Sequence, residues 1–183
     1  MTETLAPLPP AKSEWTIGWR IVLGCALGAG AGIVLLFFTF NMFVLPLSQE
    51  LSVTRGEIGS IQALIVTGAL GAVVVGRAAD RFGFKPIYLA CALIVIGGQV
   101  LAVMLSSSLL HMAITIAVLG FFGVGTTAVV ITRPVNAHFR EYRGRALGLV
   151  ATGTSLFAIA APQVLEPIIT GYGWRGGFLA LAG

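Results

Sequence analysis

Many of the charged side chains in this sequence fall in two short clusters. Residues 76–86 read Gly-Arg-Ala-Ala-Asp-Arg-Phe-Gly-Phe-Lys-Pro, and residues 138–145 read His-Phe-Arg-Glu-Tyr-Arg-Gly-Arg. Neither cluster has the residue spacing of a metal site, a nucleophilic triad or a phosphate-binding glycine loop. Arginines beside an acid such as Asp80 are suited instead to ion pairs and to the recognition of anions. The two clusters therefore predict no enzyme, metal or cofactor.

Outside these clusters the sequence is strongly apolar. Of 183 residues, 57% are hydrophobic and 10% are charged, and the mean hydropathy is +0.96. Soluble domains carry about 25% charged residues, so lipid must surround most of this chain. The net charge of +4 comes from cations at the ends of apolar runs, which is the pattern of membrane orientation and not of nucleic-acid binding. Cys25 and Cys91 lie inside such runs and are expected to be small buried side chains.

Apolar runs of about 20 residues, the length that crosses a bilayer, predict five spans and the start of a sixth. Residues 1–19 are expected to be a disordered cytoplasmic tail, and residues 20–183 one helical bundle. The uncharged stretch 86–132 must hold two spans, because as one helix it would reach about 70 Å. Residues 166–175 are expected to be a loop. The predicted spans are about 21–45, 58–76, 86–105, 110–135 and 146–165, with a partial run at 176–183.

The distribution of cations predicts the orientation in the membrane. Eight Lys and Arg residues fall in the tail and in the loops on its side, and two fall in the loops on the opposite side. Because basic loops stay in the cytoplasm, the N-terminus and the turn around Asp80 are expected to be cytoplasmic. The two residues on the opposite side are Arg55 and Arg175.

The turn at residues 76–85 resembles the signature G-x-x-x-D-R-x-G-x-K, which joins the second and third helices of major facilitator superfamily transporters. The matching residues are Gly76, Asp80, Arg81, Gly83 and Lys85. Phe84 departs from the signature, since a second cation usually stands there. Residues 139–148 resemble the basic loop between the fourth and fifth helices of the same superfamily, and residues 172–178 resemble the beginning of its sixth helix.

This resemblance implies an all-α membrane protein, a major facilitator N-terminal helix bundle with five transmembrane helices plus the start of a sixth. It implies secondary active transport of a small solute by alternating access between two six-helix halves. The quoted loops are most similar to branches that carry small organic anions, including monocarboxylates and oxalate or formate. A missing C-terminal half or a partner half is therefore expected. The alternatives are a truncated or accessory membrane protein without transport activity of its own, and an oligomeric pore.

The resemblance also implies roles for single residues. The family's equivalent of Asp80 pairs with cations and with a helix terminus of the other half, which implies a gating role for the signature turn. Since the first, second, fourth and fifth helices of the family line the substrate path, four polar residues are candidates to contact solute, although such groups more often bond between helices. These four are Asn41, Gln62, Thr152 and Ser155.

Arg133 is a further candidate, because a cation inside an apolar run is costly unless it meets water or a partner. Pro134 follows it and is expected to kink the helix there. Together they suit a guanidinium that binds an anionic substrate. The alternative is an arginine that reaches the nearby headgroups. Leu119 stands where the family often has an arginine, so the sequence does not choose among uniport, symport and antiport.

Overall fold

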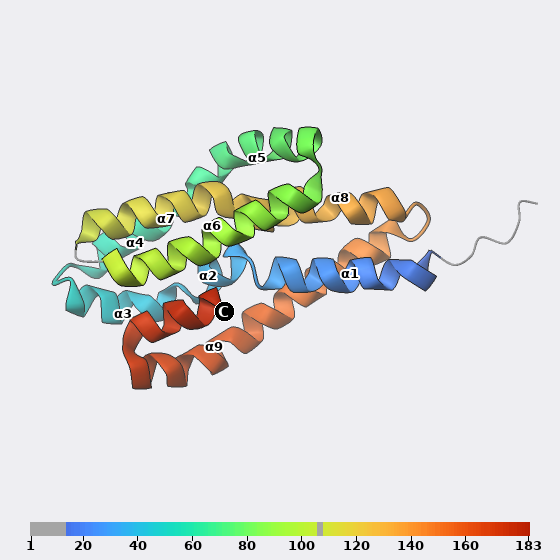
Figure 1. The fold of residues 1–183 in the computed structure, drawn as a ribbon. Coiled ribbons are helices and arrows are strands. Elements are labelled where there is room, and N and C mark those ends of the chain that lie inside the picture. Colours follow the sequence, from blue (N-terminus) through green and yellow to red (C-terminus); the bar gives the residue numbers. More distant parts are fainter. Residues whose placement is uncertain (1–13, 106–107) are drawn as a thin grey trace, which may run out of the picture.

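The computed structural model describes residues 14–105 and 108–183, and every regular element in these ranges is helical. Long helices run back and forth in an antiparallel bundle (Figure 1). Residues 1–13, most of the predicted tail, lie outside the described residues. In chain order the elements are α1 (Trp15–Gly30), α2 (Ile33–Thr39), α3 (Asn41–Glu50), α4 (Arg55–Ala63), the 3-10 helix η1 (Leu64–Thr67), α5 (Gly68–Phe82), α6 (Phe84–Leu105), α7 (Leu109–Gly123), the 3-10 helix η2 (Val124–Thr126), α8 (Ala128–His138) and α9 (Arg143–Ala182).

Four stretches of the described chain are long and apolar enough to cross a membrane, and the bent pair α1–α2 makes a fifth if it counts as one span. This agrees with the predicted class of a helical membrane bundle. The four stretches are Arg55–Phe82, Phe84–Met104, Leu109–His138 and Arg143–Ala182.

The first apolar run is not the single helix predicted over residues 21–45. Helix α1 begins at Trp15, inside the predicted tail, because Trp15 packs against Phe139 with ring centroids 5.0 Å apart. The run then breaks at Ala31 and Gly32, where α1 and α2 meet at an angle of 45°. A second break interrupts the fourth run, where η2 and Thr127 separate α7 from α8.

The end of the chain also differs from the prediction. Residues 166–175 are not a loop, because α9 continues through Pro162 and Pro167 as far as the reversal at Gly173. Gly173 has φ 71°, a backbone conformation that glycine adopts without steric cost. The chain turns back there, and the last segment, drawn red in Figure 1, lies beside the earlier helices. Its Phe178 packs against Phe43 of α3, with ring centroids 4.7 Å apart.

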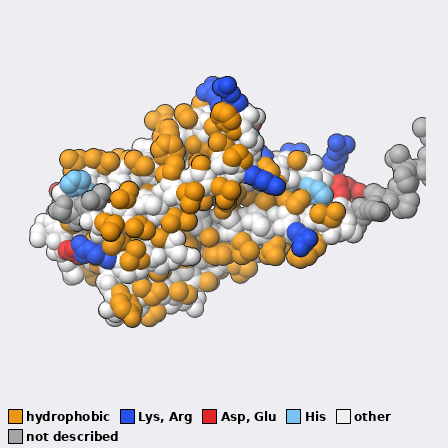
Figure 2. All heavy atoms as spheres, in the orientation of Figure 1, with side chains coloured by type: hydrophobic (Ala, Val, Ile, Leu, Met, Phe, Trp, Pro, Cys, Tyr) orange, Lys and Arg blue, Asp and Glu red, His pale blue; other side chains and the backbone are white. Residues whose placement is uncertain are grey.

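Apolar side chains both fill the bundle and cover its outside. One buried cluster joins α2, α3 and α7 through Leu36, Phe43 and Ile116. Large apolar side chains are nevertheless exposed, and Val66 and Leu70 are 75% and 70% accessible. Figure 2 shows such side chains spread over the face in view. A surface of this kind is stable in a hydrocarbon solvent and not in water.

Candidate functional site

The signature turn closes the end of α5. Helix α5 ends at Phe82, Gly83 follows with φ 88°, and α6 begins at Phe84. A positive φ is strained for a residue with a Cβ atom, which accounts for a glycine at this position. Lys85 is exposed at the start of α6.

Arg133 of α8 binds this turn. Its guanidinium forms an ion pair with the carboxylate of Asp80. Its Nη2 donates a hydrogen bond to the carbonyl oxygen of Gly76 at 3.1 Å, and its Nε donates to the carbonyl oxygen of Val129 at 3.3 Å. Arg133, which was predicted to bind substrate, thus contacts Asp80 and Gly76, which were predicted to take part in gating. We call Gly76, Asp80 and Arg133 the gate cluster.

The other signature cations lie outside the gate cluster. The guanidinium of Arg81 stacks over the ring of Phe82, 5.4 Å from its centroid. Lys85 borders a groove of about 590 Å³ between α1, α6 and α8, together with Arg20 and His138. Although Arg81 is adjacent to Asp80 in sequence, the ion pair of Asp80 is made with a residue 53 positions away.

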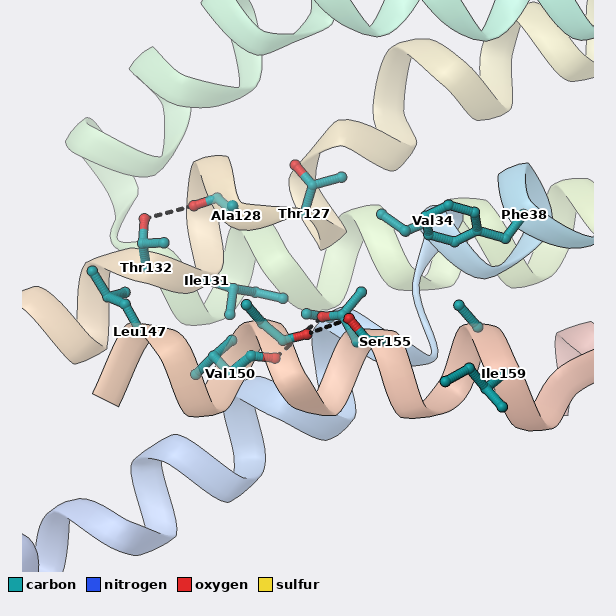
Figure 3. A pocket seen from close by; sticks show the side chains of 14 residues that line it. Val34, Phe38, Thr127, Ala128, Ile131, Thr132, Leu147, Val150, Ser155 and Ile159 are labelled. Atoms are coloured by element: carbon teal, nitrogen blue, oxygen red, sulfur yellow. Dashed lines mark hydrogen bonds between the residues drawn. The ribbon is translucent and has the colours of Figure 1, made fainter. Parts of the chain in front are cut away.

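A larger cavity, of about 630 Å³, lies between α1, α2, α8 and α9. Both broken spans contribute to it: Ala29 and Val34 flank the bend in the first, and Thr127 and Ala128 lie where α8 begins after the break in the fourth. Figure 3 shows Phe38 at one end and Leu147 at the other. No lining side chain is charged; the complete lining is Ala29, Val34, Phe38, Thr127, Ala128, Ile131, Thr132, Leu147, Val150, Ala151, Thr154, Ser155, Ala158 and Ile159.

The polar groups of this cavity are hydroxyls. Thr132 Oγ1 donates to the carbonyl oxygen of Ala128 at 2.6 Å, and Ser155 Oγ donates to that of Ala151 at 3.1 Å, as the dashed lines in Figure 3 show. Because these protons bond within their own helices, the oxygen lone pairs remain for a ligand. Ser155, one of the residues predicted to contact solute, therefore lines this cavity. Thr152 is exposed and is not among the lining residues.

The two remaining candidates lie elsewhere. Gln62 borders a separate groove of about 440 Å³, together with Phe37 and Val66. Asn41 is exposed at the first position of α3 and borders none of the cavities described here. No group of three His, Cys, Asp or Glu side chains within residues 14–105 and 108–183 is placed to hold a metal ion.

With this geometry in place, comparison with known proteins decides the family. Residues 15–183 match the family model described as Major Facilitator Superfamily. The chain belongs to the major facilitator superfamily. The resemblance of the signature turn is confirmed by a match that covers nearly the whole chain.

Curated relatives of this superfamily member are monocarboxylate transporters. Monocarboxylate transporter 4 of Gallus gallus is 28% identical over 91% of this chain and 35% of its own length. Monocarboxylate transporter 3 of Gallus gallus is 24% identical over 97% of this chain and 32% of its own length. Monocarboxylate transporter 3 of Rattus norvegicus is 32% identical over 95% of this chain and 35% of its own length. The chain thus spans about a third of the length of the relatives it matches, and those relatives are transporters rather than enzymes.

Two acidic residues that the sequence did not single out tie parts of this major facilitator bundle together. The carboxylate of Glu14 accepts hydrogen bonds from the backbone N–H groups of Arg140, Glu141 and Tyr142, at 2.9, 3.3 and 3.2 Å. These bonds, that of Arg140 above all, lower the pKa of Glu14. The position of Glu14 a few residues before the first apolar run was the available signal, but its partners lie more than 100 residues away.

Glu50 makes the second link, between α3 and the segment after Gly173. Trp174 Nε1 donates to Glu50 Oε2 at 2.5 Å, and Arg175 Nη1 pairs with Glu50 Oε1 at 2.5 Å. Arg175 also stacks over the Trp174 ring, 4.5 Å from its centroid. The hydrogen bond from Trp174, followed by the contacts of Arg175, lowers the pKa of Glu50.

Proposed function

We propose that this chain forms one half of a secondary carrier that moves small organic anions, monocarboxylates in particular, by alternating access. The observation that carries this proposal is the uncharged cavity whose walls include both broken spans. Carriers bind their solutes at the membrane midplane between two repeats, and discontinuous helices commonly form the site. The names of the curated relatives point to the same class of solute.

The cavity lining restricts how an anion is accommodated. A bare carboxylate is costly to bury beside apolar walls, and no cation borders this cavity. The positive charge that balances a bound anion must therefore come from a proton or from a residue of the second half. The guanidinium of Arg133 is held by Asp80 and Gly76, which favours a gating role over direct substrate binding for this residue.

Alternating access requires a second lobe that rocks against the first. We propose that a C-terminal half or a partner half covers the cavity, and that the segment after Gly173 begins a sixth helix of this half. Since the relatives are about three times as long as the matched region, their length leaves room for a second half of similar size. Ser155, Thr154 and Phe38 would then face the solute from this side.

The N-terminus and the gate cluster are proposed to be cytoplasmic. The signature turn, the loop before α9 and the start of α1 lie at one end of the bundle, and the turn at Gly173 lies at the other (Figure 1). Cysteine labelling tests this orientation, since the native Cys25 and Cys91 are buried. Phe84→Cys should react from the cytoplasm and Ser52→Cys from outside. The reverse pattern would overturn the assignment.

The transport proposal is tested by uptake of labelled lactate into proteoliposomes that hold the chain together with its second half, with a pH gradient applied and removed. Ser155→Phe should reduce saturable uptake at least about tenfold, because the ring fills the cavity. Val164→Phe is the matched control, since Val164 lies on the same helix, is 60% exposed and is not among the lining residues. Equal uptake by both variants would place the substrate elsewhere. Flux without saturation would indicate a pore, and absent uptake an accessory membrane protein.

A further inference from the structure

The two broken spans of the bundle meet at their breaks. In the first span, Gly32 separates α1 from α2; in the fourth, Thr127 has extended backbone, with φ −101° and ψ −175°, between η2 and α8. A Cβ atom placed on Gly32 would lie 2.5 Å from Thr126 Oγ1 and 2.9 Å from the Thr126 carbonyl oxygen. Only glycine permits this approach, so the two breaks are in direct contact.

One hydroxyl serves both breaks. A helix break leaves carbonyl groups unpaired on one side and N–H groups unpaired on the other. Thr126 Oγ1 donates to the carbonyl oxygen of Gly123 at 2.7 Å, where α7 ends, and accepts a hydrogen bond from the backbone N–H of Ile33 at 3.0 Å, where α2 begins. The Thr126 residue is 1% exposed. At so buried a position either backbone group would be costly to leave unpaired.

A side chain of another helix also binds a backbone carbonyl group at the end of α1, before the first break. The hydroxyl of Tyr88, on α6, donates to the carbonyl oxygen of Gly28 at 3.2 Å. The bend between α1 and α2 is thus fixed by side chains from α6 and from the fourth span. Its geometry depends on where those neighbours lie.

We propose that Thr126 is a shared pivot, which couples the bend between α1 and α2 to the break between α7 and α8. It is a positioning residue, because it is not among the residues that line the 630 Å³ cavity. Residues at both breaks do line it: Ala29 and Val34 lie on either side of the first, and Thr127 and Ala128 lie where α8 begins after the second. A change in the angle at one break is transmitted through Thr126 to the other break. Both spans that line the cavity then move together, and the shape of the cavity changes.

If Thr126 is a shared pivot, loss of its hydroxyl should loosen the backbone at both breaks and nowhere else. Thr126→Val keeps the side-chain shape but removes both hydrogen bonds. Amide hydrogen exchange, measured by mass spectrometry on the full chain in lipid nanodiscs, should then rise at least about tenfold in residues 31–35 and in residues 124–128. Thr126→Ser, which keeps the hydroxyl, should exchange like the wild type.

The matched control is Thr115→Val, on the same span. Thr115 Oγ1 bonds only to the carbonyl oxygen of His111 in its own helix, so its loss should leave both segments protected. If the valine variant fails to insert, Thr126→Ala compared with Thr126→Ser makes the same test with smaller side chains. Unchanged exchange in both segments, or faster exchange in one alone, would overturn the shared pivot.

The consequence for transport rests on the proposed carrier function. In reconstituted carrier, Thr126→Val should lower the maximal rate of lactate uptake about tenfold and leave KM within about twofold, because Thr126 does not contact solute. Thr126→Ser should restore the rate. An equal fall in rate for Thr126→Ser and Thr126→Val would contradict a role for the hydroxyl. If the wild type takes up no lactate, the carrier proposal fails, while the exchange experiment still decides the pivot.

Discussion

Arg133 of α8 and Asp80 of α5 form an ion pair that joins the fourth span to the signature turn. The pair is partly open to solvent, with side-chain exposures of 29% and 70%. Exposed ion pairs contribute little to stability, but this one is reinforced by the hydrogen bond from Arg133 to the Gly76 carbonyl oxygen at 3.1 Å. Asp80, which the resemblance led us to expect to pair with the other half, is thus paired within this chain.

We predict a coupling energy of about 0.5–1 kcal/mol between Asp80 and Arg133. It is measured by a double-mutant cycle on the free energy of unfolding in mixed detergent micelles, with Asp80→Asn, Arg133→Gln and the double variant. Arg77→Gln is the matched control, because Arg77 lies one helical turn before Asp80 and is exposed. A coupling of Asp80 with Arg77 as large as that with Arg133 would show that overall charge, and not this pair, is responsible.

Gly71 is predicted to be indispensable for packing α5 against α7. A Cβ atom at Gly71 would lie 2.0 Å from the backbone carbonyl oxygen of Phe121, so Gly71→Ala forces two helix backbones apart. We expect a loss of about 3 kcal/mol in the free energy of unfolding. Gly97→Ala is the control: nothing lies within 4 Å of its Cβ position, and alanine should stabilise the helix by about 0.5–1 kcal/mol. Similar values for both variants would contradict close packing at Gly71.

The sequence predicted a bundle of apolar membrane helices, because long uncharged runs must be buried in lipid wherever they lie. It also placed a turn at Gly83, where glycine and the charges around it mark the end of a span. The bend at Gly32 was not predictable in this way, since the groups that stabilise it are Thr126 and Tyr88 of other helices. The reversal at Gly173 lies inside residues 166–175, which were predicted to be a loop, but α9 continues as a helix up to it.

The candidate site was harder to predict than the spans for the same reason. Ser155 lies in the cavity and Asn41 does not, although both are polar residues within or near an apolar run. Packing between helices decides which face of a helix contacts a neighbour. The sequence of one helix alone does not contain this information. The pairing of Arg133 with Asp80 likewise requires α5 and α8 to be neighbours.

Trp174→Phe is predicted to weaken the link between α3 and the last segment. The change removes the hydrogen bond from Nε1 to Glu50 and retains a ring that packs on Phe178, whose centroid lies 5.7 Å away. Hydrogen bonds to charged groups contribute about 1.5–3 kcal/mol, and because Glu50 is partly exposed we expect a loss of about 1 kcal/mol. Thermal unfolding in detergent measures this loss. Trp19→Phe is the control, since Trp19 is 51% exposed; an equal loss there would refute the link.

The link between Glu14 and the loop before α9 is predicted to depend on pH. Backbone N–H groups, that of Arg140 first, lower the pKa of Glu14 in the folded chain, and His138 lies near the same carboxylate. A carboxyl whose pKa is lowered by folding stabilises the fold above its unfolded pKa and loses that contribution as the pH falls through the folded value. The wild type should therefore have a higher Tm than Glu14→Gln at about pH 7, and the difference should vanish below the usual range of glutamate.

The control for this pH dependence is Glu141→Gln. Glu141 is exposed and lies in the same loop, but it is the carboxylate of Glu14 that accepts the backbone N–H groups of residues 140–142. Its substitution should shift Tm little at any pH. If Glu14→Gln and the wild type keep the same difference in Tm across the titration, the ionised carboxylate of Glu14 does not stabilise the contact between α1 and the loop before α9. A difference that grows as the pH falls would reverse the sign of the predicted linkage.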